Sequence, residues 1–114
     1  MADFHWQEST TSNVPTVAMS GRLDIDTAPE LRRVLHKHIG DRPSGLLLDL
    51  SGLDFMDTSG LATLIEARQL LQQDGGRLAL FGLATQIAEV FSMAQVEGMF
   101  TIVATESEAL EALR

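Results

Sequence analysis

The chain has 114 residues, of which 16 are acidic and 8 are basic, so its formal net charge is −8, and it contains no cysteine. This length predicts one domain, residues 1–114, and the acidic balance disfavours nucleic acid and membrane surfaces as partners. The missing cysteines exclude disulfides and the common zinc ligand sets, and the N-terminus lacks a signal-peptide pattern, so we expect a cytoplasmic protein without metal or cofactor.

The N-terminal part of the chain predicts two strands and a helix. Apolar and polar residues alternate over residues 4–8 and 14–20, which favours two strands joined by a hairpin turn at residues 9–13. Residues 27–30 (TAPE) match a capping box with proline in the first turn. An amphipathic helix is therefore expected from this point to Gly40.

The rest of the chain alternates between strands and helices. Residues 46–50 (LLLDL) form a short apolar run, which predicts a strand buried on both faces and followed by a turn at Ser51-Gly52. The later elements are a helix beginning at residues 57–60 and stopped by 74–76, a strand at 77–81, a helix with Ile87, Val90, Phe91 and Ala94 on one face, a strand at 100–103, and a helix opened by a capping box at 105–108. This alternation predicts an α/β domain with a mixed sheet of four to five strands and about four helices.

The segment around Thr58 combines acids and hydroxyls immediately before a helix. Asp57 or Thr58 as a helix cap is a sufficient structural explanation, but it leaves the adjacent hydroxyl of Ser59 and the helix-disfavouring Gly60 unexplained. No Lys or Arg occurs between Arg42 and Arg68. A phosphate on a hydroxyl here would meet backbone N–H groups and add nearly two negative charges to an acidic region, which is the chemistry of a switch.

A second group of acids follows Gly21. Asp24 and Asp26 belong to a predicted loop at the end of a strand, and ordinary loop polarity would explain both. Loops at the carboxyl ends of parallel strands meet at one edge of a sheet, so this loop is expected beside the one near Thr58. We expect a cluster of acids around one hydroxyl, made of residues 24, 26, 49, 54 and 57.

The sequence contains few signals of catalysis. His36 and His38 project about 200° apart on a helix, so they are interpreted as two solvated surface side chains. A small nucleotide-binding or hydrolytic enzyme would need Thr58 or Ser59 as its nucleophile, with Asp57 or a histidine as base. No histidine lies near residues 57–60 in the sequence, so we expect that the protein is not an enzyme.

Several segments together resemble the STAS domain family, most closely the bacterial anti-sigma factor antagonists. They are GRLD at residues 21–24, DTAPEL at 26–31, LDLSGLDFMDTSGLATLIEA at 48–67 and DGGRLALFG at 74–82. The resemblance extends from about Val14 to Leu113, and FMDTSGL at 55–61 is its most specific part. It implies a STAS-type single domain.

The resemblance also implies a function. Family members bind an anti-sigma factor that is a serine/threonine kinase, and phosphorylation ends that binding until a phosphatase reverses it. The phosphorylated position maps onto Thr58, where many antagonists have serine, with Ser59 as the fallback acceptor. The implied partner-binding residues are Gly21, Asp24, Asp26, Asp57, Thr58, Ser59 and Gly60.

One alternative within the same fold is a STAS subunit that docks constitutively on another complex, such as a transporter ATPase. It would not need a modifiable hydroxyl at Thr58. In both cases a monomer or weak dimer is expected.

Overall fold

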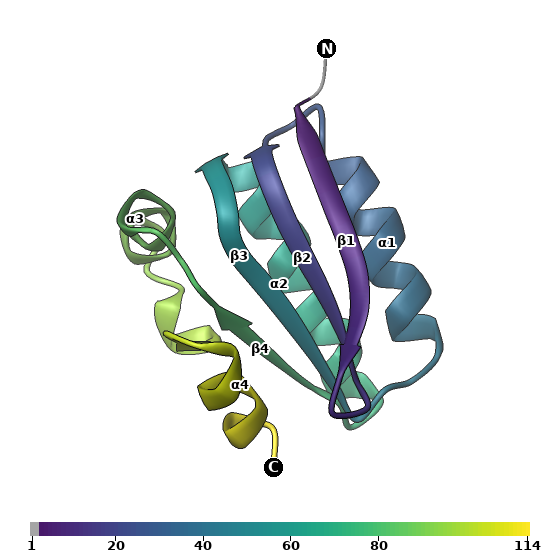
Figure 1. The fold of residues 1–114 in the computed structure, drawn as a ribbon. Coiled ribbons are helices and arrows are strands. Elements are labelled where there is room, and N and C mark those ends of the chain that lie inside the picture. The colour runs from purple at the N-terminus through teal and green to yellow at the C-terminus, as the bar shows by residue number, and fades with distance from the viewer. Residues whose placement is uncertain (1–2) are drawn as a thin grey trace.

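A computed structural model describes residues 3–114 of the chain (Figure 1). Five strands and four α-helices occur in this range, with one 3₁₀ turn. They are β1 (Phe4–Thr11), β2 (Val14–Leu23), α1 (Ala28–Gly40), β3 (Gly45–Met56), α2 (Thr58–Gln73), β4 (Arg77–Phe81), α3 (Thr85–Met93), η1 (Glu97–Met99), β5 (Thr101–Val103) and α4 (Glu106–Ala112). The predicted α/β class and the element order are confirmed.

The strands form one mixed sheet in the order β1-β2-β3-β4-β5. β1 and β2 form an antiparallel hairpin, whereas β2 to β5 run parallel and are joined by helical crossovers. Because β2 and β3 are parallel neighbours, their carboxyl ends lie at the same edge of the sheet. Figure 1 shows the starts of α1 and α2 at that edge.

The helices cover the two faces of the sheet unequally. α1 and α2 pack on one face over the main core, which includes Leu23, Leu31, Leu48 and Leu64. α4 covers part of the other face through a smaller cluster of Leu47, Ala79, Phe81 and Ala109. α3 contributes Ile87 and Phe91 to the main core and lies beside the end of β3 (Figure 1). No helix within residues 3–114 is both long and apolar enough to cross a membrane.

The first three strands are longer than their sequence patterns predict. The hairpin turn is confined to Ser12 and Asn13, whose φ angles of 50° and 69° suit the tight two-residue turns that match strand twist. The prediction of a turn over residues 9–13 is therefore wrong, because the polar residues before Ser12 pair with β2 instead. The turn predicted at Ser51-Gly52 is also wrong, since β3 continues through it with a register shift against β2.

Two histidines thought to be solvated make close contacts with carboxylates. His36 Nε2 lies 2.8 Å from Glu66 Oε1 of α2, and His38 Nε2 lies 2.7 Å from Glu8 Oε1 of β1. Hydrogen bonds from His36 and then Arg32 lower the pKa of Glu66 below its ordinary value. These pairs join residues 30 or more positions apart, which sequence spacing alone does not reveal.

Candidate functional site

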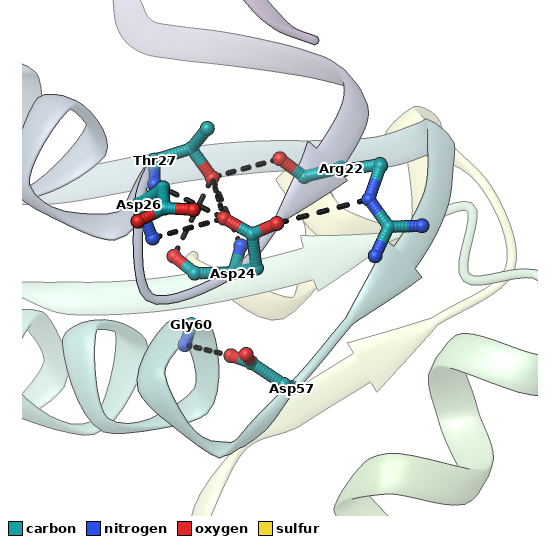
Figure 2. A network of polar contacts seen from close by, with 6 residues as sticks. All are labelled: Arg22, Asp24, Asp26, Thr27, Asp57 and Gly60. Carbon is teal, nitrogen blue, oxygen red and sulfur yellow. Dashed lines mark hydrogen bonds and ion pairs between the residues drawn. The ribbon is translucent and has the colours of Figure 1, made fainter. Parts of the chain in front are cut away.

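The site is built where β2 and β3 end together. Leu23 is paired with Met56 in the sheet, and the Asp57 backbone amide donates a 3.1 Å hydrogen bond to the Leu23 carbonyl. This bond joins the loop after β2 to the start of α2, and Figure 2 shows the two segments next to each other. The expected proximity of the two loops is confirmed.

The loop after β2 is held by its own side chains. Asp24 Oδ1 accepts hydrogen bonds from the amides of Asp26 at 3.0 Å and Thr27 at 3.2 Å (Figure 2). The buried Thr27 hydroxyl donates to the Arg22 carbonyl at 2.8 Å and accepts from the Asp24 amide at 2.9 Å. The capping box predicted from Thr27 is therefore wrong: its hydroxyl closes the loop behind it and makes no cap bond to α1.

The start of α2 places Thr58 at the surface. Asp57 is the N-cap, and its Oδ1 accepts from the amides of Ser59 at 2.9 Å and Gly60 at 3.3 Å. Thr58 is the first residue of the helix and is exposed, whereas Ser59 is half-buried. Of the two candidate hydroxyl-bearing residues, Thr58 is thus the more accessible to another protein.

The two glycines among the predicted site residues are buried and shape the site. Gly21 has a φ of +89°, and its Cα faces the backbone of Asp3 so closely that a side chain would overlap it. A Cβ on Gly60 would lie 2.6 Å from Cγ of the buried Leu23. Both positions need glycine so that the chain can pass closely beside a neighbour.

The charges of the site include one cation that the sequence pattern did not single out. The Arg22 guanidinium lies 4.1 Å from the centre of the Phe55 ring, and its Nε is 3.7 Å from Asp24 Oδ2. This arrangement leaves Asp24 only partly exposed, while Asp26 and Asp54 are exposed. Exposed negative charge at this edge therefore comes mainly from Asp26 and Asp54.

Asp49 does not belong to this group, so the expected cluster of five acids is wrong at that position. Asp49 precedes the end of β3 by seven residues, and a strand advances about 3.3 Å per residue, so Asp49 lies roughly 20 Å from the start of α2. Its Oδ1 accepts from the Ser51 amide at 2.9 Å instead. Within residues 3–114, no group of three or more His, Asp or Glu side chains is arranged to hold a metal ion.

Sequence reasoning also missed exposed apolar residues near the site. Ile25 in the loop after β2 is 71% exposed, Phe55 is 37% exposed, and Met93 at the end of α3 is 84% exposed. Met93 and Thr58 line the same groove. The sequence shows only that these residues are apolar. Their position outside the core can be recognised only after the strands and helices have packed together.

Comparisons with known proteins place this geometry in a family. The STAS domain family matches residues 5–109, so the chain belongs to that family. It is similar to the anti-sigma-B factor antagonist of Listeria monocytogenes, with 27% identity over 81% of each chain.

Solved structures share the fold. An anti-sigma factor antagonist from Mycobacterium paratuberculosis has a TM-score of 0.89 at 24% identity, covering 97% of this chain and 94% of that one. The anti-sigma factor antagonist SpoIIAA, solved in its unphosphorylated form, has a TM-score of 0.80 at 21% identity over 96% of each chain. The Bacillus protein SpoIIAA has also been solved in its phosphorylated form, with a TM-score of 0.72 at 22% identity, covering 96% of this chain and all of that one.

Proposed function

We propose that this protein is a cytoplasmic anti-sigma factor antagonist whose binding to an anti-sigma factor is ended by phosphorylation of Thr58. The observation that carries the proposal is the exposed Thr58 at the first position of α2, beside the N-cap Asp57. The similarity to anti-sigma-B factor antagonists and the phosphorylated structure of SpoIIAA support this assignment. Ser59, which is half-buried, is the fallback acceptor.

The proposed binding surface comprises the loop after β2 and the start of α2. Asp26 and Thr58 are exposed and can contact a partner directly, while Asp24, Asp57 and Ser59 border them. Gly21 and Gly60 act through shape, because both are buried. The fixed loop is an advantage for binding, since little conformational entropy remains to be lost on association.

Phosphorylation would change this surface through charge and hydration. A phosphate on Thr58 carries nearly two negative charges and would stand next to Asp57, at an edge that already bears Asp26 and Asp54. A protein surface packing there would have to desolvate the phosphate, and any acidic group on that surface would be repelled. A loss of about 1.4 kcal/mol corresponds to a tenfold loss of affinity, so a few kcal/mol would switch the interaction off.

The transfer and removal of the phosphate would be performed by partners. We propose that the anti-sigma factor is itself a serine/threonine kinase and that a serine/threonine phosphatase resets the switch. The antagonist is then a substrate of both enzymes and acts as a monomer or weak dimer.

The test combines mass spectrometry with calorimetry on the full chain and the kinase-type anti-sigma factor of the same organism. Intact mass after incubation with that kinase and ATP should increase by one phosphate for wild type and for Ser59→Ala, and should not change for Thr58→Ala. The Thr58→Asp variant should bind the anti-sigma factor at least about tenfold more weakly than wild type.

The constitutive alternative gives a different pattern. A STAS subunit docked permanently on another complex would bind its partner equally well as wild type and as Thr58→Asp. The proposed phosphorylation switch is rejected if the kinase phosphorylates the Thr58→Ser variant while wild type gains no phosphate under the same conditions. Equal affinity of wild type and Thr58→Asp would separately reject the proposed mechanism of release.

A further inference from the structure

An apolar groove lies directly beside Thr58. It has a volume of about 370 Å³ and is lined by residues of two segments, Met56, Asp57 and Thr58 at the β3–α2 junction and Val90, Met93 and Ala94 on α3. Thr58 is therefore part of the wall of the groove as well as the first residue of α2. The groove thus continues the proposed binding surface from the start of α2 onto α3.

The α3 wall of the groove is firmly held. Ile87 and Phe91 of α3 are fully buried, and the Phe91 ring meets Phe100 edge to face with ring centres 5.3 Å apart. These contacts fix α3 against the core and direct Met93 outward, where it is 84% exposed. A single exposed methionine is unremarkable by itself, but here it borders an apolar groove that is open beside the proposed phosphorylation site.

We propose that this groove is the apolar half of the anti-sigma factor docking surface and receives one aliphatic or aromatic side chain from a basic segment of that partner. The inference rests on the proposed function, because the partner is the same anti-sigma factor. The basic character follows from charge complementarity: Asp57 lies in the groove wall, Glu89 is exposed on α3, and Asp26 is exposed on the nearby loop. Methionine suits such contacts because its flexible, polarisable side chain adapts to an incoming apolar group.

Charge also argues against a second copy of this chain as the occupant. Each copy carries a formal net charge of −8. Pairing two grooves would place two acidic rims against each other, and like charges brought together at an interface disfavour association. A partner that carries arginine or lysine beside the apolar side chain that enters the groove would instead be attracted by these acidic residues.

The position of Thr58 explains how one phosphate would close the groove. Because Thr58 lines the groove, its phosphate would stand at the entrance, where an apolar side chain must shed water in order to enter. The phosphate would keep its hydration only if the apolar side chain stayed out. Docking in the groove and the phosphorylated state of Thr58 are thus mutually exclusive, so the partner is released once it has transferred the phosphate.

The test measures the affinity of the full-length chain for the anti-sigma factor by calorimetry, using variants of α3. Met93→Ala should weaken binding by about tenfold and Met93→Glu by about 100-fold, which is the range of a central interface residue. Ala88→Glu is the matched control, because Ala88 is an exposed residue of the same helix that does not line the groove. It should change the affinity by less than about threefold, and circular dichroism should show equal folding of all three variants.

The outcomes separate this inference from the proposed function. If both Met93 variants bind like wild type while Thr58→Asp does not bind, the groove is not part of the interface and the switch stands. If Met93→Glu instead dissociates a dimer in sedimentation experiments without changing the affinity for the anti-sigma factor, the groove is a self-association surface and the inference is overturned. If wild type itself does not bind the anti-sigma factor, both the function and the inference fail.

Discussion

The backbone amide of Asp57 donates a 3.1 Å hydrogen bond to the carbonyl of Leu23, and this single bond joins the two loops of the candidate site. Leu23 ends β2 and its side chain is fully buried, whereas Asp57 caps α2. The position of Thr58 is thereby tied to the sheet and not only to its own helix. The exposed Thr58 is therefore held in place by the sheet as well as by α2.

The cap at Asp57 should contribute measurably to stability. Asp57→Ala removes the acceptor of the Ser59 and Gly60 amides, so we expect the free energy of unfolding to fall by about 1 kcal/mol. Asp57→Asn keeps an acceptor oxygen and should lose less. Urea denaturation of the two variants and wild type checks this, and equal midpoints for Asp57→Ala and wild type would contradict the role of the cap.

Gly60 should not tolerate a methyl group although it lies in a helix. A Cβ there would lie 2.6 Å from Leu23 Cγ and 3.0 Å from Met56 Cγ, and overpacking of a core typically costs about 1–3 kcal/mol. Gly40→Ala is the matched control, because a Cβ at this other helical glycine meets nothing within 4 Å. We expect Gly60→Ala to lower the thermal midpoint and Gly40→Ala to leave it unchanged or raise it. A Gly60→Ala variant as stable as wild type would show that Leu23 can move aside.

The Thr27 hydroxyl should be needed for the loop after β2. Thr27→Val keeps the shape of the side chain but leaves the Asp24 amide without the hydroxyl that it contacts at 2.9 Å, so we expect a loss of about 1–3 kcal/mol. Thr27→Ser retains the hydroxyl and should be less affected. Chemical denaturation measures the difference. We expect the Thr27→Ser variant to be more stable than the Thr27→Val variant, and the reverse order would contradict the role of the hydroxyl.

The carboxylate of Glu66 should make stability depend on pH. Its pKa in the folded protein is lowered by hydrogen bonds from His36 and then Arg32. Glu66 therefore stabilises the fold fully at pH values above its ordinary pKa of 4.5, where it is ionised in both the folded and the unfolded state. This contribution is lost as the pH falls through the lowered pKa. Glu66→Gln should therefore be less stable than wild type near pH 7, by at most about 1 kcal/mol for such an exposed pair, and the difference should shrink in acid. A difference that is constant from pH 7 to pH 3 would contradict this account.

Asp26 should accelerate association with a basic partner. It is exposed at the rim of the proposed surface, and rim charges act mainly on the association rate. Asp26→Asn is expected to lower the association rate about two- to fivefold at low salt, with the effect disappearing at about 1 M salt because the charges are screened. Glu111→Gln on α4 changes the net charge equally and is the control. Stopped-flow kinetics would refute the steering role if both variants slow association alike.

Much of the fold is predictable from local sequence patterns. The strand at Arg77–Phe81, the helix start at Thr58 and the cap at Thr105, whose hydroxyl accepts from the Glu108 amide at 3.2 Å, are each encoded within a few residues. The ends of β1 and β3 were not, since residues expected to form turns there continue the strands and pair with β2. Local patterns cannot reveal such pairing, because the partner strand is distant in the sequence.

The sequence by itself determined the class of fold, the candidate hydroxyl at Thr58 and the acids Asp54 and Asp57 that precede it. Only the tertiary structure decided which acids are close: it excluded Asp49, which lies far along β3, and paired Glu66 with His36 and Arg32. It also brought Met93 of α3 beside Thr58 in one groove. The physical reason is that helix and strand formation depend on neighbouring residues, whereas a surface is assembled from segments that meet only when the core is packed.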